Sequence, residues 1–283
     1  MRRNSRGGIV RLVRRGGGPS SPGRWASCAE TPLEAAAGDS AERIPPDRGR
    51  VQAPIVEWER LLDIAIAALV LVALSPVIVL VALAIKLDSR GPVLFRCTRV
   101  GRGGRHLGML KFRKMRVGVS GPPLTAANDD RFTRIGRLLA RTKLDEIPQF
   151  WNVLRGEMSL VGPRPEDPRI VCLHREEFAK ILRVRPGITG LSQLAFANEA
   201  QILAVDDRLH DYLERILPQK MRLDRLYVDR SSLPMYLQIL AWTFAAVCLG
   251  KQVAVHRSTG RLTVRAPRAH QAASVLVDSA RSG

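Results

Sequence analysis

The chain has 283 residues, which is enough for one large domain or two small ones. Its 45 lysines and arginines against 26 acidic residues give a formal net charge of +19. This charge indicates either a solvated basic surface or attraction of nucleic acid, phosphorylated substrates or an anionic lipid leaflet. Nucleic acid ranks last among these partners, because basic and aromatic residues are not interleaved and no recognition motif is present. The scattered cysteines, without a Cys-x-x-Cys pair, argue against a structural zinc site.

Both ends of the chain are predicted to be tails. Residues 1–54 are rich in Arg, Gly, Pro, Ala and Ser and lack an apolar period, which indicates a disordered basic N-terminal tail. The basic stretch from Arg2 to Arg15 is not followed directly by an apolar core and a cleavage site, so we expect no cleaved signal peptide. Residues 253–283 have a similar composition and are predicted as a C-terminal tail.

The segment from Ile64 to Ile85 is apolar apart from Ser75 and Pro76 at its middle. As a helix it would be about 33 Å long, which matches a bilayer core of roughly 30 Å. A proline in a helix interior removes a hydrogen bond and costs about 3 kcal/mol. The segment is therefore expected to break at Ser75-Pro76, either as a kinked span or as a re-entrant hairpin that enters and leaves by one face.

Charge on both flanks favours the re-entrant form, because the positive-inside rule then places both ends on the cytoplasmic side. We therefore expect residues 55–86 to form a re-entrant membrane helix, although composition alone leaves a true span open. The flanking cations are Arg43, Arg48, Arg50 and Arg60 on one side and Lys86, Arg90, Arg96, Arg99, Arg102 and Arg105 on the other.

A cytoplasmic catalytic domain is expected over residues 87–252. Residues 93–100 and 106–115 flank a glycine-containing loop and predict a β-hairpin. Residues 134–141, 170–184 and 207–226 have amphipathic helical spacing, and residues 233–249 predict a short core or interfacial helix. The fold class is therefore α+β and largely helical.

Two adjacent carboxylates mark the most informative stretch, residues 143–156. Leu144, Ile147 and Trp151 recur at helical spacing, and a proline at 148 is tolerated only in a first turn. The predicted helix therefore begins near Asp145, which places Asp145 and Glu146 at its positive end, where each anion gains about 0.3–1 kcal/mol. The simpler alternative is that Asp145 only caps the helix.

Two arginines stand in proline-stiffened turns. Arg164 lies between Pro163 and Pro165, and Arg185 precedes Pro186. A rigidly presented guanidinium suits a forked contact to phosphate. Together with carboxylates able to hold a divalent cation and a membrane anchor, these arginines indicate chemistry on a membrane-borne phosphate.

Residues of about 57–250 resemble the bacterial sugar transferase family, the monotopic polyprenyl-phosphate hexose-1-phosphate transferases. The resemblance rests on motifs that occur in the family's order. These are the Ser75-Pro76 break, Lys111 to Met115, Lys143 to Gln149, Val161 to Glu166, Arg185 to Gly190 and Leu223 to Val228.

The resemblance implies a Mg²⁺-dependent phosphoglycosyl transferase of the cytoplasmic (inner) membrane. Such an enzyme passes a sugar 1-phosphate from a nucleotide-sugar donor to polyprenyl (undecaprenyl) phosphate, the initiating step of exopolysaccharide or other surface glycoconjugate synthesis. Asp145 would be the nucleophile, and Glu146 a metal ligand or a base. Lys111 and Arg164 would hold phosphate, with Arg185 and Asp224 as further members of the site.

One departure from the family affects phosphate binding. Many relatives carry an arginine five residues before the nucleophile, where this chain has Ala140 followed by Arg141. Either Arg141 takes over this contact, which makes it an additional candidate phosphate ligand, or the affinity for phosphate is reduced. The alternative function is a catalytically degenerate basic membrane protein that binds anionic lipid or a partner. The retained Asp145, Glu146 and Arg164 favour the enzyme. The sugar, the nucleotide base and the oligomeric state stay open.

Overall fold

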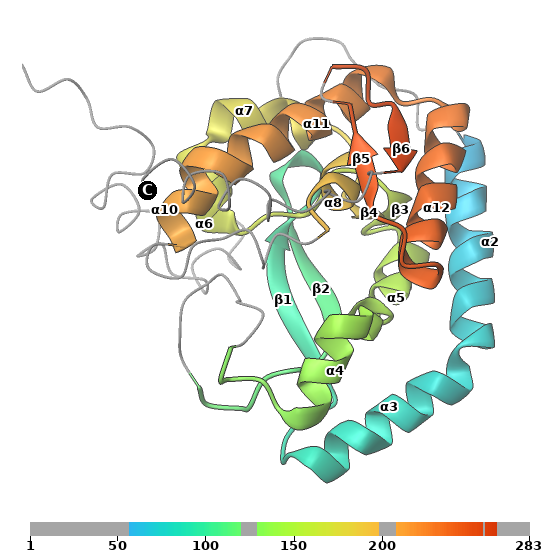
Figure 1. Ribbon diagram of the computed structural model, residues 1–283, viewed down its shortest axis with the longest axis vertical. Helices are drawn as coiled ribbons and strands as arrows, with labels where there is room; N and C mark the ends of the chain where they lie inside the picture. Colours follow the sequence, from blue (N-terminus) through green and yellow to red (C-terminus); the bar gives the residue numbers. More distant parts are fainter. Residues whose placement is uncertain (1–56, 120–128, 198–207, 257, 265–283) are drawn as a thin grey trace, which may run out of the picture.

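A computed structural model describes residues 57–119, 129–197, 208–256 and 258–264 (Figure 1). The predicted N-terminal tail, residues 1–54, lies outside the described residues, as does most of the predicted C-terminal tail. The described chain is mostly helical with three two-stranded sheets, so the α+β class is confirmed.

The apolar segment forms two helices, α2 (Glu57–Ala73) and α3 (Ser75–Asp88), which meet at a bend of 61°. The Ser75 hydroxyl donates to the Val72 carbonyl at 2.8 Å, and Pro76 lies in the first turn of α3, where its missing N–H costs no hydrogen bond. The predicted break at Ser75-Pro76 is therefore confirmed. Within the described ranges no one helix has the length and apolarity of a membrane span, whereas this bent pair taken together does.

The predicted hairpin consists of the antiparallel strands β1 (Leu94–Val100) and β2 (His106–Phe112). The short helix η2 (Arg102–Gly104) joins them, and Gly103 adopts a φ of 65°, which suits glycine. The Gly103 amide donates to the Leu182 carbonyl at 2.7 Å, so the tip of the hairpin is tied to the helical region above it (Figure 1).

The helix predicted to begin at Asp145 is divided into two pieces. After α4 (Arg134–Thr142), the 3₁₀ turn η3 (Leu144–Glu146) carries both carboxylates, and α5 (Gln149–Leu154) begins only after Pro148. Pro148 has no N–H with which to continue the α-helical pattern. The turn is closed by 3₁₀ bonds instead, among them Ile147 N to Leu144 O at 3.2 Å.

Two short parallel strands, β3 (Ser159–Val161) and β4 (Gly187–Thr189), were not predicted from the sequence. They bring the Pro163-Arg164-Pro165 turn beside the turn that precedes Gly187. A Cβ atom on Gly187 would lie only 2.1 Å from the Gly162 nitrogen, so the approach requires glycine.

The remaining helices pack around the hairpin and these strands. The segment predicted as one helix over residues 170–184 breaks at His174, where the first helix ends. A π-helical turn, η4, continues directly into α11. The elements are α6 (Pro168–Leu173), α7 (Arg175–Ile181), α8 (Leu191–Ala195), α10 (Arg208–Asp211), η4 (Tyr212–Ile216), α11 (Leu217–Arg230) and α12 (Leu233–Cys248).

The structure differs from the prediction at the beginning of the C-terminal tail. Residues 253–264 contain an antiparallel hairpin of β5 (Val253–Val255) and β6 (Leu262–Val264). Val253 and Leu262 are buried in the main core. Strands of three residues leave too short an apolar pattern to be recognised in the sequence.

Helix α2 is part of this main core and is not merely appended to it. Ala67 of α2 is fully buried together with side chains from β2, α5, β3, α11 and α12. Helices α2 and α12 run along the right edge of Figure 1 and are joined by a hydrogen bond from the Tyr236 hydroxyl to Asp63 Oδ1 at 2.7 Å. Outward-facing side chains of the bent pair, such as Leu69, Val72 and Val79, are exposed and apolar.

Candidate active site

Asp145 is a buried carboxylate that forms one ion pair with the residues that the structure describes. Its side chain is only 3% exposed, and Lys114 Nζ lies 3.1 Å from its Oδ2. Lys114 lies two residues after β2, so the end of the hairpin supplies the charge that stabilises Asp145. Lys114 belongs to one of the motifs in the sequence, but no role was predicted for it. It lies beyond the strand, so the alternation of side chains along β2 gives no signal for its position.

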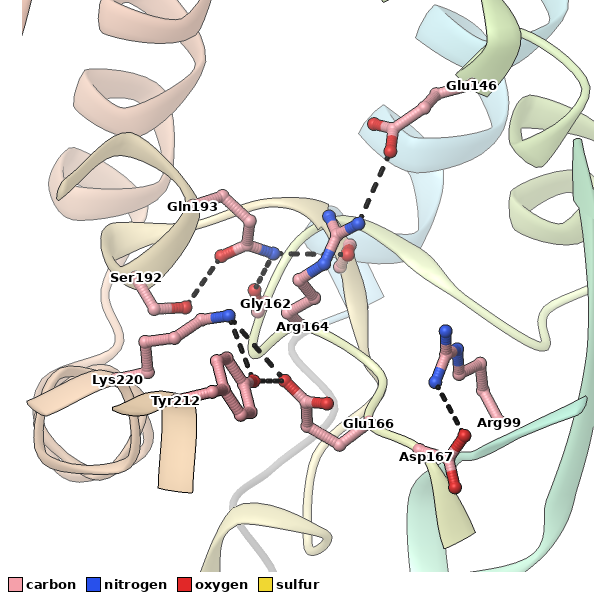
Figure 2. A network of polar contacts seen from close by, with 11 residues as sticks. Arg99, Glu146, Gly162, Arg164, Glu166, Asp167, Ser192, Gln193, Tyr212 and Lys220 are labelled. Atoms are coloured by element: carbon pink, nitrogen blue, oxygen red, sulfur yellow. Dashed lines mark hydrogen bonds and ion pairs between the residues drawn. The ribbon is translucent and has the colours of Figure 1, made fainter. Parts of the chain in front are cut away.

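Glu146 is held by two cations from different segments. Its Oε1 lies 3.0 Å from Lys111 Nζ on β2 and 3.4 Å from Arg164 Nη2 in the loop after β3. Figure 2 shows the Arg164 guanidinium directed at the Glu146 carboxylate. The structure therefore brings together four of the residues expected in the site: Asp145, Glu146, Lys111 and Arg164.

The electrostatics of this cluster keep Glu146 ionised. Burial alone would raise its pKa, but Lys111, Arg164 and Lys143 outweigh burial and hold the pKa of Glu146 well below its usual range. Burial also lowers the pKa of Lys111, with Glu146 opposing that shift. At neutral pH Glu146 is therefore a carboxylate with little affinity for a proton, which suits a ligand for a cation better than a base.

Asp145 and Glu146 together form a carboxylate dyad. Asn152 of α5 fixes the segment that carries this dyad to β2. The side chain is 1% exposed. Its Oδ1 accepts from the Leu110 amide, and its Nδ2 donates to the Gly108 carbonyl, each at 3.0 Å. These bonds hold α5 at the strand that carries Lys111. The sequence offered no signal for this role beyond a polar residue within an apolar helical pattern.

Two predicted phosphate ligands form no hydrogen bond or ion pair with Asp145 or Glu146. Arg141 is exposed at the end of α4 and makes no hydrogen bond or ion pair with any residue that the structure describes. Arg185 donates from Nε to the Gly156 carbonyl at 3.1 Å. Burial and the charge of Arg60 on α2 lower its pKa. The structure thus associates Arg185 with the far end of α5.

Asp224 lies in a second, buried cluster that Arg164 adjoins. Burial raises its pKa to about 7, opposed by Ser192 and Lys220 and reinforced by Glu166. Its Oδ1 has no hydrogen-bond partner within the described ranges. The charge of Arg164 also acts on Asp224, so the two clusters share this arginine.

The rest of this second cluster consists of Glu166, Tyr212 and Lys220 (Figure 2). The Tyr212 hydroxyl donates to Glu166 Oε1 at 2.8 Å, and Lys220 Nζ donates to the Tyr212 oxygen at 3.2 Å and lies 3.7 Å from Glu166 Oε1. Tyr212 and Lys220 were not predicted as site residues, because nothing in their helical pattern separates them from other amphipathic positions.

The carboxylates of the dyad are suitable ligands for Mg²⁺. Among the described residues no group of three or more His, Cys, Asp or Glu side chains could hold a metal ion. Mg²⁺ does not require such a group, because it is usually held by one or two carboxylates together with substrate phosphates and water. The ionised Glu146 beside Asp145 provides such a pair.

Known proteins match most of the described chain. Residues 56–250 match the model of a family described as bacterial sugar transferase. An undecaprenyl-phosphate glucose phosphotransferase of Komagataeibacter xylinus is 41% identical over 203 residues, covering 67% of this chain and 36% of the relative. The exopolysaccharide production protein ExoY of Sinorhizobium fredii is 32% identical over 225 residues, covering 74% and 93%.

A third relative matches a shorter part of the chain at higher identity. A UDP-glucose:undecaprenyl-phosphate glucose-1-phosphate transferase of Caulobacter vibrioides is 47% identical over 141 residues, covering 48% of this chain and 53% of the relative. This chain therefore spans about a third to a half of the length of the Komagataeibacter and Caulobacter proteins.

Proposed function

The chain belongs to the bacterial sugar transferase family, and on that premise we propose that it transfers a sugar 1-phosphate from a UDP-sugar to undecaprenyl phosphate. The products are undecaprenyl-diphosphate-sugar and UMP. The names of its relatives support this donor and acceptor, and ExoY is named for exopolysaccharide production. We place the reaction at the beginning of exopolysaccharide or other surface glycoconjugate synthesis.

One observation carries the proposal: two adjacent carboxylates are surrounded by cations from two other segments of the chain. Lys111 and Lys114 come from β2 and the residues after it, Arg164 from the loop after β3, and the carboxylates from η3. A diphosphate needs several cations, and a phosphoryl acceptor needs a nucleophile among them. This arrangement supplies both within one site.

In the first step Asp145 is the nucleophile. A carboxylate oxygen of Asp145 attacks the phosphorus that bears the sugar, and the bond from that phosphorus to the bridging oxygen breaks. UMP leaves with the bonding electron pair, and the phosphosugar stays on Asp145 as a mixed anhydride. Lys111, Lys114 and Arg164 screen the negative charge of the donor. No proton has to move, because the nucleophile is ionised and the leaving group departs as an anion.

In the second step an oxygen of undecaprenyl phosphate attacks the same phosphorus. The bond from phosphorus to Asp145 breaks, and the free carboxylate is restored. Two steps let the two anionic substrates approach one at a time, so that the same cations serve both. The low pKa of Glu146 makes it a poor proton acceptor, so we assign it to the metal and not to general-base catalysis.

We propose that Asp145 and Glu146 hold Mg²⁺ with the substrate phosphates. When bound, the ion supplies charge neutralisation on the phosphoryl oxygens. The protein's own part is to orient Asp145 through Lys114 and to keep Glu146 ionised through Lys111 and Arg164.

We further propose that α2 and α3 form a re-entrant hairpin in the cytoplasmic membrane, with the catalytic residues on the cytoplasmic face. The bend at Ser75-Pro76, the exposed apolar side chains and the cationic flanks support this topology. It would place the headgroup of the lipid acceptor at the depth of the catalytic residues.

Turnover of a panel of donors tests the function. The full-length protein in detergent micelles with Mg²⁺ and undecaprenyl phosphate should release UMP from one or a few UDP-sugars and form an equal amount of lipid-linked sugar diphosphate. The Asp145→Asn variant is the matched control. UMP release without lipid product, or equal release by the control, would contradict the proposal.

Topology is tested by labelling. Single cysteines placed near residues 50 and 90, in a background without other cysteines, should both be shielded from an impermeant thiol reagent in intact cells. Replacing Ser75 and Pro76 with leucine should increase labelling at the residue-50 site, because the straightened helix can span. Labelling of the residue-50 site in the parent protein would establish a span.

A further inference from the structure

Two ionisable side chains on α2 point into the protein, although they lie on the helix that we assign to the membrane. Asp63 is 1% exposed. Its Oδ1 accepts from the Leu160 amide at 2.8 Å, from the Ser159 hydroxyl at 3.1 Å and from Tyr236. Arg60 lies almost one turn earlier, where the sequence indicated only a flanking positive charge.

The Arg60 guanidinium binds the C-terminal end of α5. Its Nη1 donates to the Val153 carbonyl at 2.6 Å and its Nη2 to the Leu154 carbonyl at 2.8 Å. The last carbonyls of a helix have no partner within the helix and form the negative end of its dipole. A forked guanidinium contacts two of them at once, whereas an ammonium is a single point charge. The Val153 carbonyl also accepts from the Gly156 amide at 2.9 Å, and the Leu154 carbonyl is the second acceptor of the fork. Arg185 adds a third bond at Gly156.

The dyad lies on η3, just before the opposite end of α5. Hydrogen bonds continue from η3 into α5, with Ile147 N donating to Leu144 O at 3.2 Å and Phe150 N donating to Ile147 O at 3.1 Å. The segment from Asp145 to Leu154 is therefore one short bonded unit. Asn152 holds its middle to β2, and Arg60 holds its end to α2. A rotation of this unit would move both carboxylates relative to Lys111 and Lys114.

We propose that Arg60 is a positioning residue, which fixes the dyad segment from the helix that also seats the protein in the membrane. The inference rests on the proposed function. Its consequence is that α2 and the dyad move together, so that the depth of α2 in the bilayer sets the place of Asp145 relative to the phosphate of the lipid acceptor.

The test compares three variants of the full-length protein in detergent micelles with Mg²⁺, a UDP-sugar and undecaprenyl phosphate. Arg60→Gln removes the fork, and Arg60→Lys keeps the charge but not the fork. Lys86→Gln is the matched control, because it removes an exposed cation from the last turn of α3. No bilayer is present in micelles, so an arginine that acts only on lipid headgroups would leave turnover unchanged.

We expect Arg60→Gln to lower kcat by about 10- to 100-fold, as displacement of a reacting group by a fraction of an ångström does. The KM for the UDP-sugar should change less than about threefold, because Lys111, Lys114 and Arg164 are intact. Arg60→Lys should fall between Arg60→Gln and the parent, and Lys86→Gln should stay within about twofold of the parent. Amide hydrogen exchange in residues 149–156 should rise in Arg60→Gln and not in Lys86→Gln.

Several outcomes would overturn the inference. They are a kcat of Arg60→Gln within twofold of the parent, a loss equal to that of Lys86→Gln, or unchanged exchange in residues 149–156. If Arg60→Gln does not fold, a folded Arg60→Lys variant that has the kcat of the parent would also overturn the inference. An inactive parent protein would reject the proposed function instead, and hydrogen exchange alone would then decide whether Arg60 holds α5.

Discussion

The dyad cluster and the buried cluster around Asp224 contain the same kinds of side chain but treat a carboxyl group in opposite ways. At the dyad, cations outweigh burial and keep the pKa of Glu146 well below its usual range. Around Asp224, burial outweighs the cations and raises the pKa to about 7. The protonation state of a buried carboxyl group is therefore set by the balance between nearby charge and desolvation, not by residue type. Arg164 forms an ion pair with Glu146, and its charge also acts on Asp224 in the direction of a lower pKa.

The largest expected effect is at Asp145. With Mg²⁺ and without lipid, the parent protein should exchange labelled UMP into its UDP-sugar, because the first step is reversible. Asp145→Asn should abolish this exchange, since an amide is not a nucleophile here. Exchange that persists in Asp145→Asn, with contaminating parent enzyme excluded, would rule out the aspartyl intermediate. An active parent protein without exchange would indicate direct attack by undecaprenyl phosphate.

A smaller effect, about 100-fold in kcat/KM, is expected for Lys111→Gln, because one preorganised cation is lost from the site. The same change removes the strongest charge that lowers the pKa of Glu146, so this pKa rises and the acid limb of the pH profile of kcat/KM should move to higher pH.

Lys143→Gln is the matched control for Lys111→Gln. Lys143 is exposed and acts more weakly on Glu146, so its variant should move the acid limb less. An acid limb that stays in place in Lys111→Gln would show that Glu146 does not limit activity at low pH.

The smallest effect concerns stability at the buried cluster. Asp224 has a folded pKa of about 7 against an ordinary value of 3.8, so between these values the folded protein binds the extra proton. Stability therefore falls as pH rises from about 4 to about 7, by a few kcal/mol at most. Asp224→Asn, which does not titrate, should show a smaller decrease of the melting temperature from pH 5 to pH 8. An equal decrease in both proteins would contradict the raised pKa.

Local patterns predicted the parts of the fold that depend on neighbouring residues. The glycine loop with its flanking strands, the Ser75-Pro76 break and the adjacent dyad are all readable within a few positions. The pairing of β3 with β4 was missed because each strand has three residues and they lie 25 residues apart or more. A short, non-local pairing leaves no periodic signal.

The acidic residues of the candidate site were predicted from the sequence, but only some of its cationic residues were. Lys111 and Arg164, which were predicted to hold phosphate, form ion pairs with Glu146. Lys114 was overlooked, and Arg185 contacts the far end of α5. A motif shows that an arginine is presented rigidly but not towards which group. Likewise, an apolar helix pattern does not show that Arg60 is turned inward.

The burial of one side of α2 has a practical consequence for obtaining a water-soluble form of this protein. Deleting the helix would remove Ala67 from the main core and the bonds that Asp63 and Arg60 make with β3, α12 and α5. A protein that stays soluble without detergent should instead be obtained by replacing exposed apolar side chains of the helix. Hydrophilic replacements belong at outward positions such as Leu61, Leu69 and Val72, which are 68%, 67% and 72% exposed, while the inward side of the helix is left as it is.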